Sequence, residues 1–168
     1  DVVDTTLCRM KWSYGGTGID VVQVLKYYLA DAQAVVWREP YVDKPHVVEQ
    51  LGRVFTKLAG KGVRDLTLRV CPPPQGERAR CLEELEGLRV RMEELGAEMR
   101  YAFEPDAHDR ESVFSNGITL RLARGLDIHR RPRGAWDKGS WRMRRCKQGS
   151  LQVSIVAPGR WADLRTLE

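Results

Sequence analysis

The chain has 168 residues, 42% of them hydrophobic and 8% aromatic, so a single globular domain with its own core is expected. Its longest apolar runs, such as AVVW at 34–37, are far shorter than the roughly 20 residues that span a bilayer. No signal-peptide pattern is found at the N-terminus, so any membrane contact is expected to be peripheral. The net charge of +5 is unevenly distributed, because ten Lys or Arg and only two Asp lie between residues 121 and 147.

Helices and strands alternate in the first half of the sequence. Apolar residues recur at helical spacing in three segments, and the last of these has a charged face of Glu and Arg that is expected to be solvated. Short apolar or alternating runs between them predict strands. The predicted order is helix 20–32, strand 34–39, helix 47–62, strand 65–70, helix 77–96 and strand 98–104.

The second half is predicted to contain only strands. Residues 112–114 and 118–123 flank an S-N-G turn, and residues 141–156 read as a last pair of strands that turns at Gln148 and Gly149. Helices interleaved with strands, followed by strands alone, predict one α/β domain whose mixed sheet is flanked by helices.

The cysteines and histidines indicate neither a metal centre nor a cofactor. Four cysteines lie far apart without a CxxC pair, so they are expected to be reduced, structural thiols of an intracellular protein. His46, His108 and His129 are too dispersed to suggest a metal cluster.

The basic stretch from Arg121 to Lys147 interleaves arginines with Trp136 and Trp141, a composition that suits phosphoinositide headgroups or nucleic acid. Indole rings also favour the headgroup level of a membrane. A solvated loop and strand face with its aromatic rings in the core is the alternative. In the first interpretation the ligand-binding candidates are nine of the ten cations of this stretch: Arg121, Arg124, Arg130, Arg131, Arg133, Lys138, Arg142, Arg144 and Arg145.

Residues 108–117, HDRESVFSNG, contain a partial catalytic motif. Phospholipase D-type enzymes use H-x-K-x-x-x-x-D, in which histidines attack phosphorus and protonate the leaving oxygen while lysines hold the phosphoryl oxygens. Here His108 is present, but Arg110 replaces the lysine and Ser115 replaces the aspartate. His108 and Arg110 are therefore ligand-binding candidates and at most vestigial catalytic residues. A histidine satisfied in the core is the alternative for His108.

The extended segment HDRESVFSNGITLRLARGLDIHRRP resembles the phospholipase D-like C-terminal domain of MIT-domain-containing proteins. That family is marked by an H-D-R-E segment, an N-G turn, and R-G-L-D followed by a basic, proline-containing stretch. The segments VVWREPYVDKPHVVEQL and CLEELEGLRVRMEELGAEMRYAF are similar to earlier elements of the same domain. The resemblance covers residues 19–157, which leaves 1–18 as an expected N-terminal extension and 158–168 as a C-terminal tail.

This resemblance implies a phospholipase D-like fold, a homodimer, an incomplete catalytic motif, and binding to acidic phospholipids, notably phosphoinositides. It also implies a link to ESCRT-III proteins, membrane remodelling and cytokinesis, at endosomes or the midbody, through a domain that is not expected within these residues. Nucleic acid is the less favoured partner.

Several acidic and polar residues are expected to shape the pocket. Glu39 and Tyr41 follow the carboxyl end of a strand, where ligands commonly bind in α/β sheets. Asn116 suits a hairpin turn with Gly117, and Asp127 is expected to pair with Arg110 or Arg124. The full set of pocket-shaping candidates is Glu39, Tyr41, Asp109, Glu111, Asn116 and Asp127.

The sequence thus predicts a dimeric, non-catalytic phospholipase D-like domain that binds acidic phospholipids through its second half. Two alternatives remain open. One is an active phosphodiesterase or nuclease in which a dimer brings two copies of His108 into one site. The other is a dimeric scaffold for a partner protein.

Overall fold

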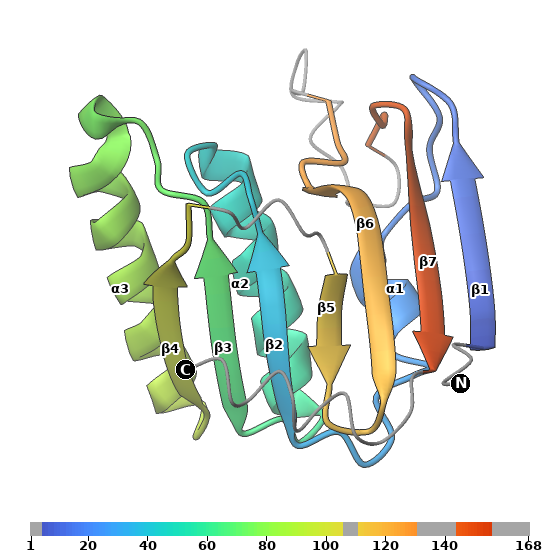
Figure 1. Ribbon diagram of the computed structural model, residues 1–168, viewed down its shortest axis with the longest axis horizontal. Coiled ribbons are helices and arrows are strands. Elements are labelled where there is room, and N and C mark those ends of the chain that lie inside the picture. Colours follow the sequence, from blue (N-terminus) through green and yellow to red (C-terminus); the bar gives the residue numbers. More distant parts are fainter. Residues whose placement is uncertain (1–4, 106–110, 131–143, 156–168) are drawn as a thin grey trace.

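The computed structural model describes residues 5–105, 111–130 and 144–155. Within these residues the chain forms a single mixed sheet with helices packed against it (Figure 1). The strands are β1 (Thr5–Trp12), β2 (Ala34–Glu39), β3 (Asp65–Val70), β4 (Glu98–Phe103), β5 (Glu111–Phe114), β6 (Ile118–Leu126) and β7 (Gly149–Ile155). The helices are α1 (Val21–Leu25), α2 (Pro45–Gly60), the short 3₁₀ helix η1 (Gln75–Glu77) and α3 (Arg78–Glu94).

The sheet has seven strands in the order β1-β7-β6-β5-β2-β3-β4. Strands β2, β3 and β4 are parallel, because each is connected to the next by a helix that returns the chain to the same edge. The remaining pairings are antiparallel, from the β5–β6 hairpin across to β1 at the far edge. This arrangement confirms the predicted α/β class and the mixed sheet.

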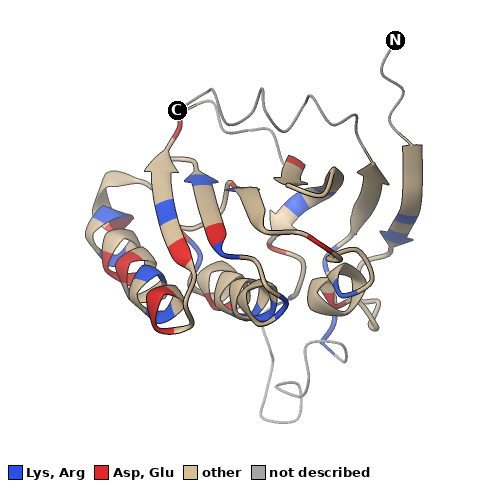
Figure 2. Cartoon of the chain, turned by 90° about the horizontal axis from the view of Figure 1, so that it is seen from below, with Lys and Arg blue, Asp and Glu red and all other residues tan. Residues whose placement is uncertain are grey.

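Helices α1, α2 and α3 all lie on the same face of the sheet (Figure 2). The core forms between them and the side chains that each strand points toward them, and Trp37 of β2 meets Phe55 of α2 edge to face at 6.1 Å. The apolar stripe predicted for α2 is buried as expected, at Val47, Leu51, Val54, Phe55 and Leu58. No described helix has the length and apolar character needed to cross a bilayer.

The helix predicted over residues 20–32 is confirmed only at its start. The Asp20 carboxylate accepts a hydrogen bond from the Val22 N–H and caps α1, but the helix ends at Leu25. Asp31 then adopts a φ of +60°, which no helix continues through. Leu29 and Ala32 are nevertheless buried, so the apolar spacing is satisfied by turns that lead into β2.

The predicted hairpin over residues 141–156 is wrong where the structure describes it. Residues 144–148 form no strand, only an isolated bridge between His129 and Cys146. Strand β7 begins at Gly149 and pairs instead with β1 and β6. A Cβ at residue 149 would lie 2.8 Å from the Trp12 ring, so the close packing of β1 against β7 requires glycine at this position.

Strand β1 was not predicted, and it lies within residues 1–18, where the sequence indicates an extension. Its side chains Cys8, Met10 and Trp12 alternate and pack against the core. This period of two is the signal that could have revealed the strand.

Candidate functional site

Strands β2 and β6, which flank the short strand β5, both end at the edge of the sheet that also holds the carboxyl ends of β3 and β4 (Figure 1). The last residue of β2, Glu39, accepts a 2.8 Å hydrogen bond from the Leu126 N–H at the end of β6. Ligands of open α/β sheets commonly bind at the carboxyl ends of the parallel strands. A functional site is therefore expected among the residues that follow β2 and β6.

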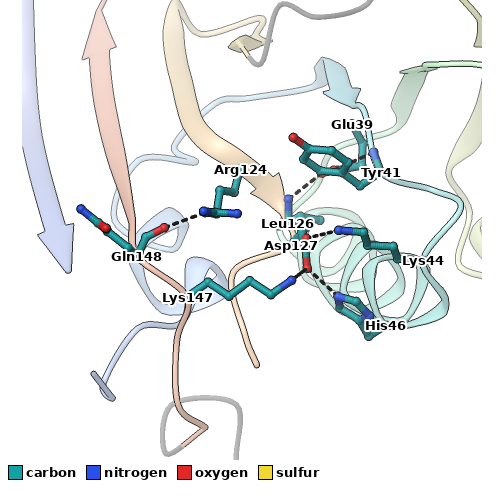
Figure 3. A network of polar contacts seen from close by, with 9 residues as sticks. All are labelled: Glu39, Tyr41, Lys44, His46, Arg124, Leu126, Asp127, Lys147 and Gln148. Carbon is teal, nitrogen blue, oxygen red and sulfur yellow. Dashed lines mark hydrogen bonds and ion pairs between the residues drawn. The ribbon is translucent and has the colours of Figure 1, made fainter. Parts of the chain in front are cut away.

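A buried carboxylate at this edge gathers three basic side chains, as Figure 3 shows. Asp127, directly after β6, is 3% exposed, and its Oδ1 lies 2.7 Å from His46 Nε2 and 2.6 Å from Lys147 Nζ. Its Oδ2 accepts a hydrogen bond from Lys44 Nζ. We call these four residues, Asp127, Lys44, His46 and Lys147, the Asp127 cluster.

The cluster carries more potential positive charge than its single carboxylate can neutralise. Burial by itself raises the pKa of the Asp127 carboxyl, but hydrogen bonds from the three basic partners outweigh burial and hold the pKa well below its ordinary range. Asp127 is thus ionised at neutral pH and compensates one of two lysines. Lys44 and His46 stand at the N-terminus of α2, whose unpaired N–H groups add partial positive charge.

The basic side chains of the cluster remain partly open to solvent. The exposed fractions are 38% for Lys44, 41% for His46 and 28% for Lys147. Because an ammonium group has three N–H donors, each lysine can stay bound to Asp127 and still donate to an incoming anion. The buried carboxylate therefore holds the cations in place without using up their donors.

Behind the cluster lies a second buried carboxyl group, Glu39, whose burial raises its pKa to about 8 even though the N–H groups of Leu126 and Tyr41 favour the charged form. Gly125 of β6 lies against it with a φ of +53°. Tyr41 lies beside Lys44, whose Nζ is 4.8 Å from the ring centroid. Glu39 and Tyr41 were predicted to shape the pocket. In the structure Glu39 holds the backbone next to Asp127, and the Tyr41 ring lies beside Lys44.

Further cations of the basic stretch surround this edge. Arg124 Nε donates to the Gln148 carbonyl oxygen at 2.7 Å, and the Arg130 guanidinium lies 4.5 Å from the Tyr14 ring centroid. Arg145 is exposed and donates to the Gly15 carbonyl oxygen, while Arg144 is half-buried. These four predicted ligand-binding residues thus belong to the end of β6 or to the segments that follow β6 and precede β7, at the same end of the sheet as the Asp127 cluster.

The prediction that Asp127 pairs with Arg124 is wrong. Arg124 donates to the Gln148 backbone, while Asp127 is paired with Lys44, His46 and Lys147. The reason is that Asp127 lies just beyond β6, where the chain faces the N-terminus of α2. The other predicted partner, Arg110, lies outside the described residues.

Two further candidates lie elsewhere on the sheet. Glu111 of β5 pairs with Arg121 of β6 at 3.0 Å, a cross-strand ion pair on the face without helices. Asn116 lies at the opposite end of the sheet, where its amide donates to the Tyr28 and Ala30 carbonyl oxygens and its carbonyl oxygen accepts from the Ile118 N–H. Asn116 therefore fixes the β5–β6 hairpin.

Ser115, which stands where phospholipase D enzymes carry aspartate, also lies at that opposite end. Its hydroxyl oxygen accepts hydrogen bonds from the N–H groups of Gln33 and Ala34 at 2.9 and 3.0 Å. These bonds satisfy the backbone where β2 begins. In this chain the position is structural.

Several predicted site residues lie outside the described residues. These are His108, Asp109, Arg110, Arg131, Arg133, Lys138 and Arg142. Within the described ranges, no three His, Cys, Asp or Glu side chains lie close enough together to bind a metal ion.

Lys44, His46 and Lys147 were not identified as site residues from the sequence. Lys44 is separated from Asp127 by 83 residues, so no local pattern connects them. Lys44 and His46 do flank Pro45 at the predicted start of a helix, a place that attracts anions. That signal could have drawn attention to two of the three.

Comparison with known proteins relates these features to a family. The profile of the family described as "Phospholipase D-like domain at C-terminus of MIT" matches residues 18–156. MIT domain-containing protein 1 from Mus musculus is 24% identical over 151 residues, which cover 86% of this chain but only 60% of that relative. The match includes the second half of the sheet and the Asp127 cluster. The chain therefore belongs to the family of phospholipase D-like domains found at the C-terminus of MIT proteins.

Proposed function

We propose that this domain binds acidic phospholipids, phosphoinositides in particular, through the edge of the sheet that carries the Asp127 cluster. The observation that carries the proposal is the convergence of Lys44, His46 and Lys147 on one buried carboxylate, with all three side chains partly exposed to solvent. Charge-assisted hydrogen bonds to phosphate oxygens are among the strongest that a protein surface can offer.

The neighbouring arginines extend the positive charge beyond the cluster. Arg124, Arg130 and Arg145 lie at the same edge, and no described carboxylate other than Asp127 forms an ion pair with any residue of the cluster. Each Lys or Arg near an anionic membrane contributes about 1 kcal/mol of binding free energy. Several such contacts suffice for reversible, peripheral attachment.

The cellular setting follows by analogy with the family and forms part of the same proposal. We place the domain at the cytoplasmic surface of intracellular membranes, as a homodimer, in membrane remodelling linked to ESCRT-III and cytokinesis. The chain spans about 60% of the length of the mouse relative, so the ESCRT-III link is carried over only by analogy with the family.

Flotation with phosphoinositide-containing liposomes tests the lipid proposal. The variant Lys44→Gln/Lys147→Gln removes two charges but keeps a hydrogen-bond donor near Asp127. At about 1 kcal/mol per lysine, affinity should fall roughly 30-fold. Unchanged flotation of this variant would contradict the proposal, as would a wild type that ignores acidic lipids but binds nucleic acid.

The matched control is Lys57→Gln/Lys61→Gln, which removes the same charge near the other end of α2. This variant should float like the wild type. If both variants lose binding equally, net charge alone drives attachment and the Asp127 cluster is not the site.

The basic stretch has its own test. Reversing Arg130, Arg131 and Arg133 to Glu should abolish flotation without unfolding the domain. Added salt should weaken the wild type, because exposed charges are screened beyond about 10 Å at 0.1 M ionic strength. If the triple variant floats as well as the wild type, this stretch does not contact the membrane.

A further inference from the structure

The helical layer carries a groove that the lipid proposal does not use. It has a volume of about 670 Å³ and follows the outer surface of α2, with Val22 of α1 on one side and Arg91 of α3 on the other. Figure 2 shows the three helices side by side on this face, away from the opposite face of the sheet.

Basic residues line the groove at regular spacing along α2. Arg53, Lys57 and Lys61 occupy every fourth position, so they follow one another along one side of the helix about 6 Å apart. A parallel row of small residues, Gly52, Thr56 and Gly60, also lines the groove.

The cations of the groove differ in how far they are compensated. Arg53 donates to the Asp20 carboxylate at 3.1 Å and to the Gln50 side-chain oxygen at 3.0 Å. Lys57, Lys61 and Arg91 form no ion pair with any other described residue. The Arg91 guanidinium packs over Gly52, where a Cβ would be 3.3 Å from its Nη1, so it covers the groove at that residue and adds a fourth cation to the lining.

We propose that this groove binds an acidic segment of a partner protein in an extended conformation. In such a segment, side chains on one face repeat every two residues, about 6.6 Å, which closely matches the spacing of the α2 cations. Carboxylates at alternate positions would therefore meet Lys57 and Lys61 in turn, and a third would share Arg53 with Asp20. The intervening side chains would lie outward or over Val22.

The lining favours a peptide over the other polyanions. Glu49 continues the same row toward the start of α2, so a uniformly charged nucleic-acid backbone would meet a carboxylate there. An anionic membrane surface would meet the same carboxylate. A peptide can place a neutral or basic residue opposite Glu49.

The groove and the Asp127 cluster can be occupied together. The cluster lies at the N-terminus of α2, whereas Lys61 follows its last residue, and a helix of 16 residues is about 24 Å long. A partner in the groove would thus contact the side of a domain whose sheet edge faces a membrane.

Fluorescence anisotropy with a labelled Asp-Val-Asp-Val-Asp-Val peptide tests the proposal on the full chain. Lys57→Gln/Lys61→Gln should bind it about tenfold more weakly than the wild type, since two exposed ion pairs are lost. Lys44→Gln/Lys147→Gln should bind it as the wild type does. Amide resonances of residues 49–61 and of Arg91 should shift on titration.

Three outcomes would overturn it. Equal binding by the Lys57→Gln/Lys61→Gln variant would remove the groove as the site. Equal affinity for a block peptide, Asp-Asp-Asp-Val-Val-Val, would show that binding depends on the total charge and not on the spacing of the carboxylates. A thymidine oligonucleotide of equal charge that depends on Lys57 and Lys61 more strongly than the peptide would assign the groove to nucleic acid. Liposome flotation of the same variant reports on the lipid proposal separately.

Discussion

The backbone of Gly125 lies directly against the carboxyl group of Glu39, so close that a Cβ at residue 125 would be 2.3 Å from Glu39 Oε1. This contact joins the ends of β6 and β2 at the point where Asp127 leaves the sheet. The left-handed φ of +53° at Gly125 is a conformation that side chains with a Cβ rarely adopt. Both constraints require glycine at this position.

Gly125→Ala should therefore lower the free energy of unfolding by about 3 kcal/mol, from the strained φ and the overlap with Glu39 together. Urea denaturation measures the change. Gly87→Ala is the matched control, because Gly87 lies in α3 with open space around its Cα and alanine there should stabilise the helix by about 0.5–1 kcal/mol. Equal effects of the two substitutions would show that the Glu39 contact is unimportant.

Glu39 should make stability depend on pH near neutrality. Burial raises its pKa in the folded state to about 8, whereas the unfolded chain has the ordinary value of 4.5. The folded state thus keeps a proton that the unfolded state loses, so this contribution is complete below pH 4.5 and is lost as the pH rises toward 8.

Unfolding of the wild type and of Glu39→Gln should be compared by urea titration at pH 5, 6, 7 and 8. As the pH rises, the free energy of unfolding of the wild type should fall relative to that of Glu39→Gln by up to about 1.4 kcal/mol per pH unit. Other titrating groups cancel in this difference. A difference that is constant across the range would mean that Glu39 is ionised in the folded protein.

Asp127 should affect the pH dependence of stability in the opposite direction to Glu39. Its pKa is lowered in the folded state, so its contribution is present above the ordinary aspartate pKa of 3.8 and is lost as the pH falls below it. At pH 7, Asp127→Asn should cost about 2 kcal/mol, since the cations of the cluster lose their buried partner. Asp65→Asn, which breaks the exposed pair with Arg100, should cost less than about 1 kcal/mol. Equal costs would argue against a special role for the cluster.

Hydrolysis of phosphodiesters is not expected. Ser115 replaces the carboxylate of the catalytic motif, and its hydroxyl is bound to the backbone at the start of β2. Assays with lipid and nucleic-acid phosphodiesters should show no turnover, and His108→Ala should retain liposome binding. Metal-independent cleavage that disappears in His108→Ala would instead support an active enzyme.

We also propose that the chain dimerises, because phospholipase D catalysis uses its motif twice per site and this chain has one partial copy. Analytical ultracentrifugation should give the mass of two chains at micromolar concentration. A monomer at high micromolar concentration would exclude a stable dimer of these residues.

The sequence by itself determined the elements whose side chains repeat regularly. Alternation and helical spacing correctly located β2, α2, β3, α3 and β4, and the Asn116–Gly117 turn located the β5–β6 hairpin. These patterns are local, because a strand or helix repeats its buried side chains every two residues or every three to four. The α/β class followed from the order of those elements.

Only the tertiary structure decided which distant segments meet. The pairing of β1 with β7 joins Cys8 to Val153, and the Asp127 cluster brings Lys44 and His46 to a carboxylate more than 80 residues away. Spacing along the chain cannot encode such contacts, since they depend on how every element packs on the shared core. For the same reason Gly149, which by sequence suits a turn, begins a strand once Trp12 lies against it.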